Sequence, residues 1–216
     1  MSIDNTSTKK LLKTALILSA VTIIYNLIEG SVSVFFGTTD EALSLFGFGT
    51  DSFVEVLSGI GIAHMVMRMQ KTEVVQHDKF ERQALRVTGI AFYILTTGLV
   101  IGAALSIYHG SMPTTTLPGI VIAGLSILTM YILYYYKLKV GKALNSAPII
   151  SDAKCTKTCF YLSFILLGAS LSYELFKIPY VDAIGSLGIA WYAYKEGKEA
   201  FEKVKENKLS CSDDCC

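Results

Sequence analysis

The sequence predicts an all-α integral membrane protein: a six-transmembrane-helix bundle with both termini cytoplasmic. The 216 residues are 52% hydrophobic and only 17% charged, whereas a soluble domain usually has about a quarter of its residues charged. The charges gather in short segments between apolar runs, and a membrane-spanning helix needs about 20 mostly apolar residues. The basic residues also fall in alternate connections, which indicates the side of the membrane on which each connection lies.

The first two spans are residues 11–38 and 42–69. The apolar run that begins the first span continues to its end without a small-residue cleavage site, so we expect a retained span and not a cleaved signal peptide. Lysines precede the first span and basic residues follow the second, while the connection between the spans has neither Lys nor Arg. This pattern predicts a cytoplasmic N-terminus.

The third and fourth spans are residues 85–108 and 117–136, joined by a threonine-rich turn that has no Lys or Arg. Lys137, Lys139 and Lys142 follow the fourth span, so we expect these lysines in a cytoplasmic connection. Both spans are rich in Leu, Ile, Val and Gly with few polar interruptions, which favours helices over the alternating strands of a membrane barrel.

The last two spans are residues 149–176 and 179–194. Lys and Glu alternate after them, which predicts a solvated helical extension supported by pairs one turn apart. The chain therefore divides into a cytoplasmic N-terminal segment, a six-helix transmembrane domain, and a cytoplasmic helical extension with a Cys-rich tail. These three parts are residues 1–10, 11–194 and 195–216.

Three acidic residues lie well inside the predicted spans: Glu29, Asp51 and Glu55. Ionisable groups within a membrane are costly and mark a functional site by default. Asp51 and Glu55 are one helical turn apart and share a face of the second span, and the rise per residue puts them near the middle of the bilayer. The alternative is a purely structural acidic pair.

Cys155 and Cys159 form a matching pair on one face of the fifth span. The second and fifth spans run in opposite directions, so Asp51 is expected to face Cys159 and Glu55 to face Cys155. Two carboxylates and two thiolates suit a tetrahedral ion, and thiolates select Zn²⁺ or softer ions such as Cd²⁺ and Hg²⁺. Binding would release protons from these groups. The alternative is that the cysteines are small packing residues.

Three further cysteines end the chain: Cys211, Cys215 and Cys216. Two aspartates lie between them, and the cluster predicts either secondary metal capture at the cytoplasmic mouth or a disordered tail that happens to be cysteine-rich. The cysteines do not spread through polar loops as a secreted disulfide framework would, which favours reduced thiols.

Other polar residues have less defined roles. Glu29 and Asp152 are expected to line the metal cavity, and Glu29 alternatively pairs with Lys154 or Lys157. Asp182 opens the sixth span and is expected to cap it.

Four stretches resemble the transmembrane domain of the cation diffusion facilitator family: GSVSVFFG, SLFGFGTDSFVEVLSG, SDAKCTKTC and VDAIGSLGIAWYAYKEGKEAFEK. That family has a DSxxD or HxxxD pair on its second span, where this chain has Asp51 and Glu55. Its fifth span has HxxxD, and here Cys155 stands in the histidine place and Cys159 in the aspartate place. The two cysteines shift the expected preference towards softer ions.

The resemblance implies a short form without the family's C-terminal cytoplasmic domain. It further implies efflux of a divalent metal from the cytosol by alternating access, in exchange for protons and as a homodimer in the lipid bilayer of the inner or plasma membrane. We expect no enzyme activity, no permanently bound cofactor and no nucleic-acid partner.

Three other functions stay open. A membrane metal-binding accessory protein would sequester or hand on ions without transport, although a site at mid-membrane is poorly placed for hand-off. A thiol oxidoreductase would use the CxxxC pair, but this spacing lacks the usual redox CxxC turn. An importer is also compatible, because sequence predicts topology and not the direction of flux.

Overall fold

The computed structural model describes residues 5–69, 78–110, 112–144, 146–178 and 180–205. The described residues form six α-helices without strands, which confirms the all-α fold. Their bounds are α1 Asn5–Thr39, α2 Leu43–Met69, α3 Asp78–His109, α4 Leu117–Ala143, α5 Ala147–Phe176 and α6 Val181–Lys205.

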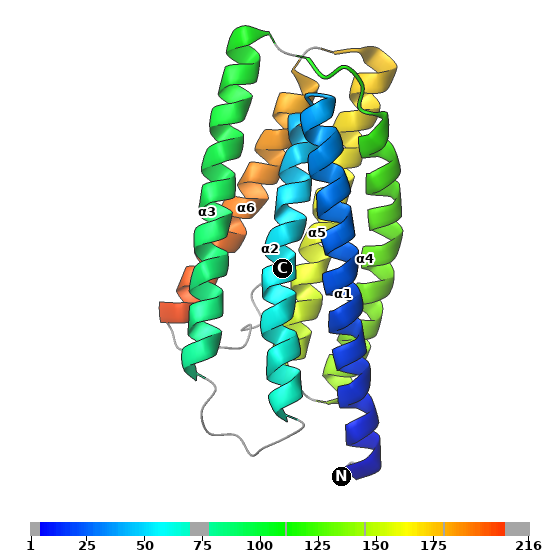
Figure 1. Ribbon diagram of the computed structural model, residues 1–216, viewed down its shortest axis with the longest axis vertical. Coiled ribbons are helices and arrows are strands. Elements are labelled where there is room, and N and C mark those ends of the chain that lie inside the picture. Colours follow the sequence, from blue (N-terminus) through cyan, green and yellow to red (C-terminus); the bar gives the residue numbers. More distant parts are fainter. Residues whose placement is uncertain (1–4, 70–77, 111, 145, 179, 206–216) are drawn as a thin grey trace.

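The helices lie side by side along the long axis of the molecule, each antiparallel to the next (Figure 1). The most extensive contacts pair α1 with α2, α4 with α5, and α3 with α6. Helix α2 also contacts α3, α5 and α6, so it has neighbours in all three pairs. The face of α2 that carries the predicted acidic pair is therefore inside the bundle and next to α5.

Within the described part of the chain, five helices are long and apolar enough to cross a membrane. They are the segments Lys9–Thr39, Leu43–His64, Gly89–His109, Leu117–Ala143 and Asp152–Phe176. Helix α6 completes the bundle: its first half is apolar, and it continues without a break through the alternating Lys and Glu residues to Lys205.

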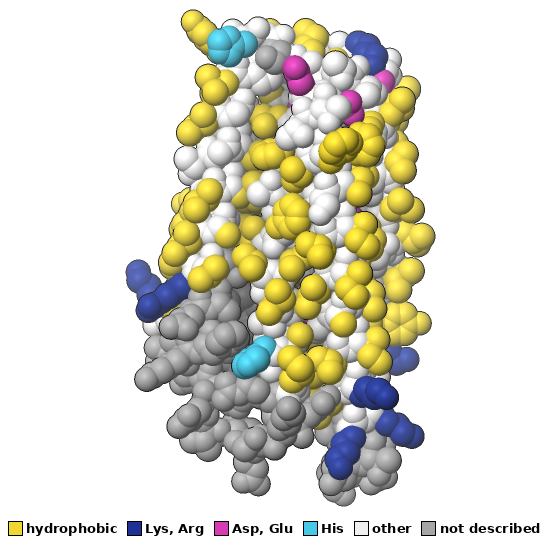
Figure 2. Space-filling model, in the orientation of Figure 1, with side chains coloured by type: hydrophobic (Ala, Val, Ile, Leu, Met, Phe, Trp, Pro, Cys, Tyr) yellow, Lys and Arg dark blue, Asp and Glu magenta, His cyan; other side chains and the backbone are white. Residues whose placement is uncertain are grey.

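The outer surface of the bundle is apolar where a bilayer would surround it. Figure 2 shows hydrophobic side chains over the middle of the molecule and most Lys and Arg side chains near its lower end, where α1 begins. Large side chains such as Ile24, Ile94 and Trp191 are more than half exposed. Apolar groups facing outward and polar groups facing inward are the arrangement expected of a membrane bundle.

Asp182 caps a different helix from the one predicted. Its carboxylate accepts hydrogen bonds from the backbone N–H groups of Leu43 (2.7 Å) and Ser44 (3.2 Å), and from the Ser44 hydroxyl. The prediction that it caps its own span was wrong, because the first N–H groups of α2 lie beside the start of α6 and need acceptors. Asp182 thereby joins α2 to α6.

Further hydrogen bonds at the same end of the bundle join the connection before α4 to the end of α5. The Glu174 carboxylate of α5 accepts hydrogen bonds from the Thr115 hydroxyl (2.7 Å) and the Thr116 backbone N–H (2.6 Å), just before α4 begins. The Tyr173 hydroxyl donates to the Pro113 carbonyl at 2.6 Å. These contacts hold the connection that precedes α4 against the end of α5.

Helix α4 extends beyond the predicted span. It continues to Ala143, and Lys137 is not in a cytoplasmic connection but inside the bundle with 1% of its surface exposed. The prediction that the three lysines lie in a connection was wrong, because Lys139 and Lys142 also belong to α4, where both are exposed. Lys137 is stabilised inside the bundle by a buried acidic partner on α5.

Candidate metal centre

Two glycines let α1 and α2 approach closely next to the predicted acidic residues. A Cβ atom at Gly49 would lie 2.7 Å from Ser33 Cβ and 2.8 Å from the Val34 backbone nitrogen, and one at Gly30 would lie 2.9 Å from the Gly49 carbonyl oxygen. These distances are too short for any side chain. Small residues at helix crossings are the usual means of close packing in membranes, where no hydrophobic driving force brings helices together.

Asp51 and Cys159 meet inside the bundle. The Cys159 thiol donates a hydrogen bond to Asp51 Oδ2 across 3.3 Å, which joins α2 to α5. Both residues are 2% exposed. The antiparallel run of the two spans predicted this facing pair, and the structure places the two side chains accordingly.

Glu55 lies one turn along α2 from Asp51 and is also buried. Its Oε2 atom has no hydrogen-bond partner. Across the described residues, no three His, Cys, Asp or Glu side chains are gathered closely enough to hold a metal ion. The predicted four-residue cluster is therefore not assembled in this conformation, although two of its members are in contact.

Neither cysteine of the predicted pair forms a disulfide in the structure. Cys155 is half-buried and Cys159 is buried, so solvent exposure falls from Cys155 to Cys159 along one face of α5. The tail cysteines, Cys211, Cys215 and Cys216, lie outside the described residues.

Glu29 reaches the same interior from α1. Its carboxylate accepts hydrogen bonds from the Tyr25 hydroxyl (2.8 Å) and the Ser52 hydroxyl (3.2 Å). Ser52 directly follows Asp51 on α2, so this network places the Glu29 carboxylate at the level of the predicted site. Hydroxyl donors, and not an ion pair, satisfy it.

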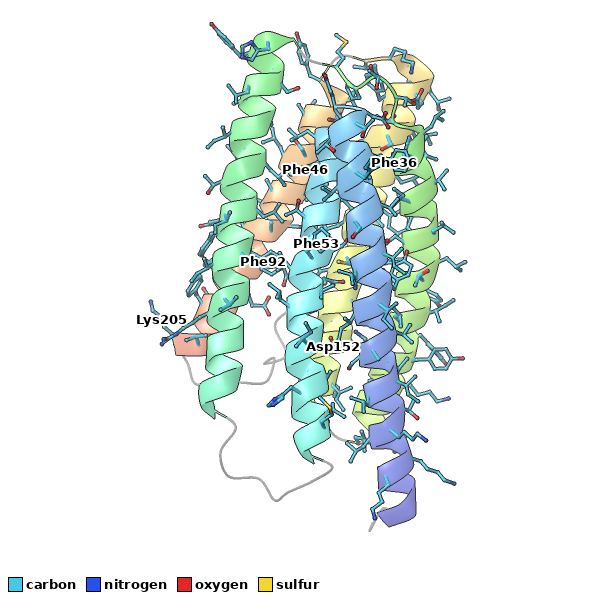
Figure 3. All side chains as sticks on the ribbon, viewed as in Figure 1. Phe36, Phe46, Phe53, Phe92, Asp152 and Lys205 are labelled. Carbon is cyan, nitrogen blue, oxygen red and sulfur yellow. The ribbon has the colours of Figure 1, made fainter. Side chains whose placement is uncertain are left out.

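Asp152 is buried on α5 at a lower level of the bundle, where Figure 3 labels it. Its Oδ2 lies 2.9 Å from Lys137 Nζ of α4, and the same ammonium donates to the Thr156 hydroxyl at 3.0 Å. The prediction of a cavity-lining Asp152 did not anticipate this ion pair. A paired carboxylate is less available to a metal ion than the acidic groups on α1 and α2.

Sequence reasoning missed the buried polar residue Asn26. Its side chain is fully buried, and neither amide atom has a hydrogen-bond partner. A signal was present in the sequence, since polar residues recur every three or four positions along the first span and share one helical face. The members of that face, all buried, are Ser19, Thr22, Asn26, Glu29 and Ser33.

Comparison with known families finds one match over most of the chain. The family model described as the cation efflux transmembrane domain matches residues 14–204. The matched region includes all or most of each of the six helices and every buried polar residue described above.

Two relatives are similar over much of the sequence. The manganese efflux system protein MneP of Bacillus subtilis is 28% identical over 192 residues, which are 83% of this chain and 63% of the relative. An uncharacterized transporter of Methanocaldococcus jannaschii is 27% identical over 174 residues, 79% of this chain and 61% of the relative. The chain thus spans about three fifths of the length of these relatives.

Proposed function

The chain belongs to the cation efflux family, as a multi-pass integral membrane protein, and we propose that it exports a divalent metal cation from the cytosol. The observation that supports this most directly is the contact between Asp51 of α2 and Cys159 of α5. It brings a carboxylate and a thiol together on two helices, away from lipid and water, where a cation crossing the bundle would need ligands.

The donor atoms favour a borderline or soft cation. A thiolate prefers Zn²⁺, Cd²⁺ or Hg²⁺, whereas carboxylates alone suit harder ions such as Mn²⁺. With Cys159 beside Asp51, and Cys155 one turn away, we assign Zn²⁺ or Cd²⁺ as the preferred cargo. The relative named for manganese efflux makes Mn²⁺ a second candidate.

Protons are the proposed counter-ion. A thiol and a carboxyl group can hold a metal ion only after they lose their protons. In the metal-free arrangement the Cys159 proton lies in the hydrogen bond to Asp51, so metal entry must displace it. Proton release on metal binding and proton uptake on metal release would couple the two fluxes.

Alternating access provides the motion. The Asp51–Cys159 contact lies between α2 and α5, so a relative shift of these helices would open or close the site. We place both termini on the cytoplasmic side, because the basic residues gather at the end of the bundle where α1 begins. A homodimer is the proposed assembly.

Transport by the reconstituted protein tests this proposal. The full chain is placed in vesicles that contain a metal indicator, and uptake of Zn²⁺, Cd²⁺, Hg²⁺ and Mn²⁺ is measured with and without an acidic interior. Asp51→Asn removes one proposed ligand charge at constant size. Glu202→Gln makes the same kind of change on the exposed part of α6 and is the matched control.

We expect Zn²⁺ or Cd²⁺ uptake that an acidic interior accelerates, with Glu202→Gln equal to the wild type and Asp51→Asn inactive. Metal flux that survives Asp51→Asn would show that the site lies elsewhere. Metal binding without flux would favour the accessory, sequestering function instead, and flux indifferent to the pH gradient would rule out proton exchange.

A further inference from the structure

The register between α1 and α2 can be followed through three contacts. The close approach of Gly30 to Gly49 lies nearest the end where α1 stops. The hydrogen bond from Ser52 to Glu29 is next along the crossing. Further along, a Cβ at Gly59 would lie 3.0 Å from Ile23 Cγ1. The helices are antiparallel, so each step back along α1 matches a step forward along α2.

This register sets Asn26 opposite Glu55. Asn26 lies between Ile23 and Glu29 on the inner face of α1, and Glu55 lies between Ser52 and Gly59 on α2. Both side chains are buried, and each has polar atoms without a hydrogen-bond partner: both amide atoms of Asn26, and Glu55 Oε2. The two facing positions therefore both hold buried polar atoms without a hydrogen-bond partner.

Unpaired buried polar groups are expensive, and each needs an explanation. Burial of an amide without a hydrogen bond is costly, and the large majority of such groups in folded proteins are paired. Asn26 is fully buried, and in this register it lies opposite Glu55, whose Oε2 also has no hydrogen-bond partner. An occupant that both oxygens can bind would satisfy the two groups at once.

The oxygens at this crossing suit a hard cation. Asn26 offers an amide oxygen, and Glu29, Asp51 and Glu55 offer carboxylates. Amide and carboxylate oxygens suit Mg²⁺, Ca²⁺ and Mn²⁺, whereas the thiols of α5 suit softer ions. Within the described residues the acidic groups are not gathered around one point, so the Glu29 carboxylate would exchange its hydroxyl donors for the ion.

We propose that Asn26 and Glu29 of α1 form, with Asp51 and Glu55, an oxygen-donor subsite that lets the transporter accept a hard divalent cation such as Mn²⁺. The inference rests on the proposed function, because it places this subsite beside the Asp51–Cys159 contact. The proposed metal path then has oxygen ligands on one side, from α1 and α2, and sulfur ligands on the other side, from α5. Selectivity depends on which side holds the ion.

Binding measurements on the full-length protein in detergent separate the two sides. Free Mn²⁺ is counted by its electron paramagnetic resonance signal, and Cd²⁺ binding is measured by calorimetry. The test variants are Asn26→Leu and Glu29→Gln, and Asn26→Asp keeps an oxygen donor at the same place. Ser33→Ala is the matched control, because Ser33 is another fully buried and unpartnered polar residue on this face but lies opposite Gly49.

We expect Asn26→Leu and Glu29→Gln each to weaken Mn²⁺ binding by more than about 10-fold and to leave Cd²⁺ binding nearly unchanged. Asn26→Asp and Ser33→Ala keep Mn²⁺ binding. Equal losses for Mn²⁺ and Cd²⁺, or unchanged Mn²⁺ binding in both variants, would overturn the inference. If the wild type moves no metal in vesicles yet shows this selective loss of Mn²⁺ binding, the proposed transport fails and the subsite stands.

Discussion

The Cys159 thiol donates its hydrogen bond to Asp51 Oδ2 across 3.3 Å, between two helices and away from solvent. Among the described residues no ion pair neutralises Asp51, and the Cys159 thiol is the hydrogen-bond donor to its carboxyl group. Such an arrangement is a poor way to stabilise a fold, because an uncompensated charge in a low-dielectric interior is strongly disfavoured. It is a suitable arrangement for binding a cation that arrives and leaves.

Asp51→Asn should therefore separate binding from stability. The substitution removes a buried ionisable group at constant size, so the metal-free variant is expected to unfold at the same denaturant concentration as the wild type or a higher one. Cd²⁺ affinity should fall by more than about 10-fold, since a ligand is lost. Unfolding in detergent and calorimetry measure the two effects. A destabilised variant with normal Cd²⁺ affinity would show that Asp51 is structural.

Lys137→Met should destabilise the bundle. It leaves Asp152 buried without its partner, and breaking a buried ion pair from one side costs about 3–5 kcal/mol. The free energy of unfolding in detergent measures this loss. Lys139→Met is the control, because Lys139 is exposed two residues further along α4. The double variant Lys137→Met/Asp152→Leu should recover much of the stability; if it is as unstable as the single variant, the ion pair does not explain the effect.

Asp182→Ala should loosen the start of α2. The carboxylate accepts hydrogen bonds from the Leu43 and Ser44 N–H groups, and loss of such a cap costs about 0.5–2 kcal/mol. Hydrogen exchange should become faster at these two amides, with little change in the middle of α2. Glu41→Ala, at an exposed position just before the helix, should leave both amides protected. Unchanged exchange in Asp182→Ala would contradict the cap.

Gly49→Ala should push α1 away from α2. The added methyl group would meet Ser33 Cβ at 2.7 Å and the Val34 nitrogen at 2.8 Å, and overpacking of this kind typically costs about 1–3 kcal/mol. Metal binding should weaken as well, because the crossing positions Glu29 beside Ser52. Gly98→Ala on α3 is the control, since nothing lies within 4 Å of the new atom. Equal stability of the two variants would contradict the close approach.

The helices were predictable because apolar runs of sufficient length are a strong local signal. The site was predictable in part, since an acidic pair and a thiol pair with helical spacing determine which side chains share a face. The end of α4 was not predictable in the same way. A lysine after an apolar run normally indicates the end of a span, and only the partner on another helix, Asp152, explains why Lys137 is buried.

The positions of Asp182 and Asn26 likewise depend on contacts with another helix, which local sequence does not reveal. Capping preference predicts that Asp182 accepts backbone N–H groups, but tertiary packing decides which helix supplies them, and here α2 does. A single asparagine within a span gives little signal by itself. Its role as a facing partner of Glu55 follows only from the antiparallel register of α1 and α2, which depends on glycines that are distant in sequence.

The most direct test of the central claim is X-ray absorption at the zinc edge. The protein is prepared with Ser at Cys155, Cys211, Cys215 and Cys216, so that Cys159 is the remaining thiol, and is loaded with one equivalent of Zn²⁺. A site between α2 and α5 predicts a sulfur neighbour at about 2.3 Å beside oxygen neighbours, which Cys159→Ala removes. A shell of oxygen and nitrogen that is identical with and without Cys159 would contradict the account.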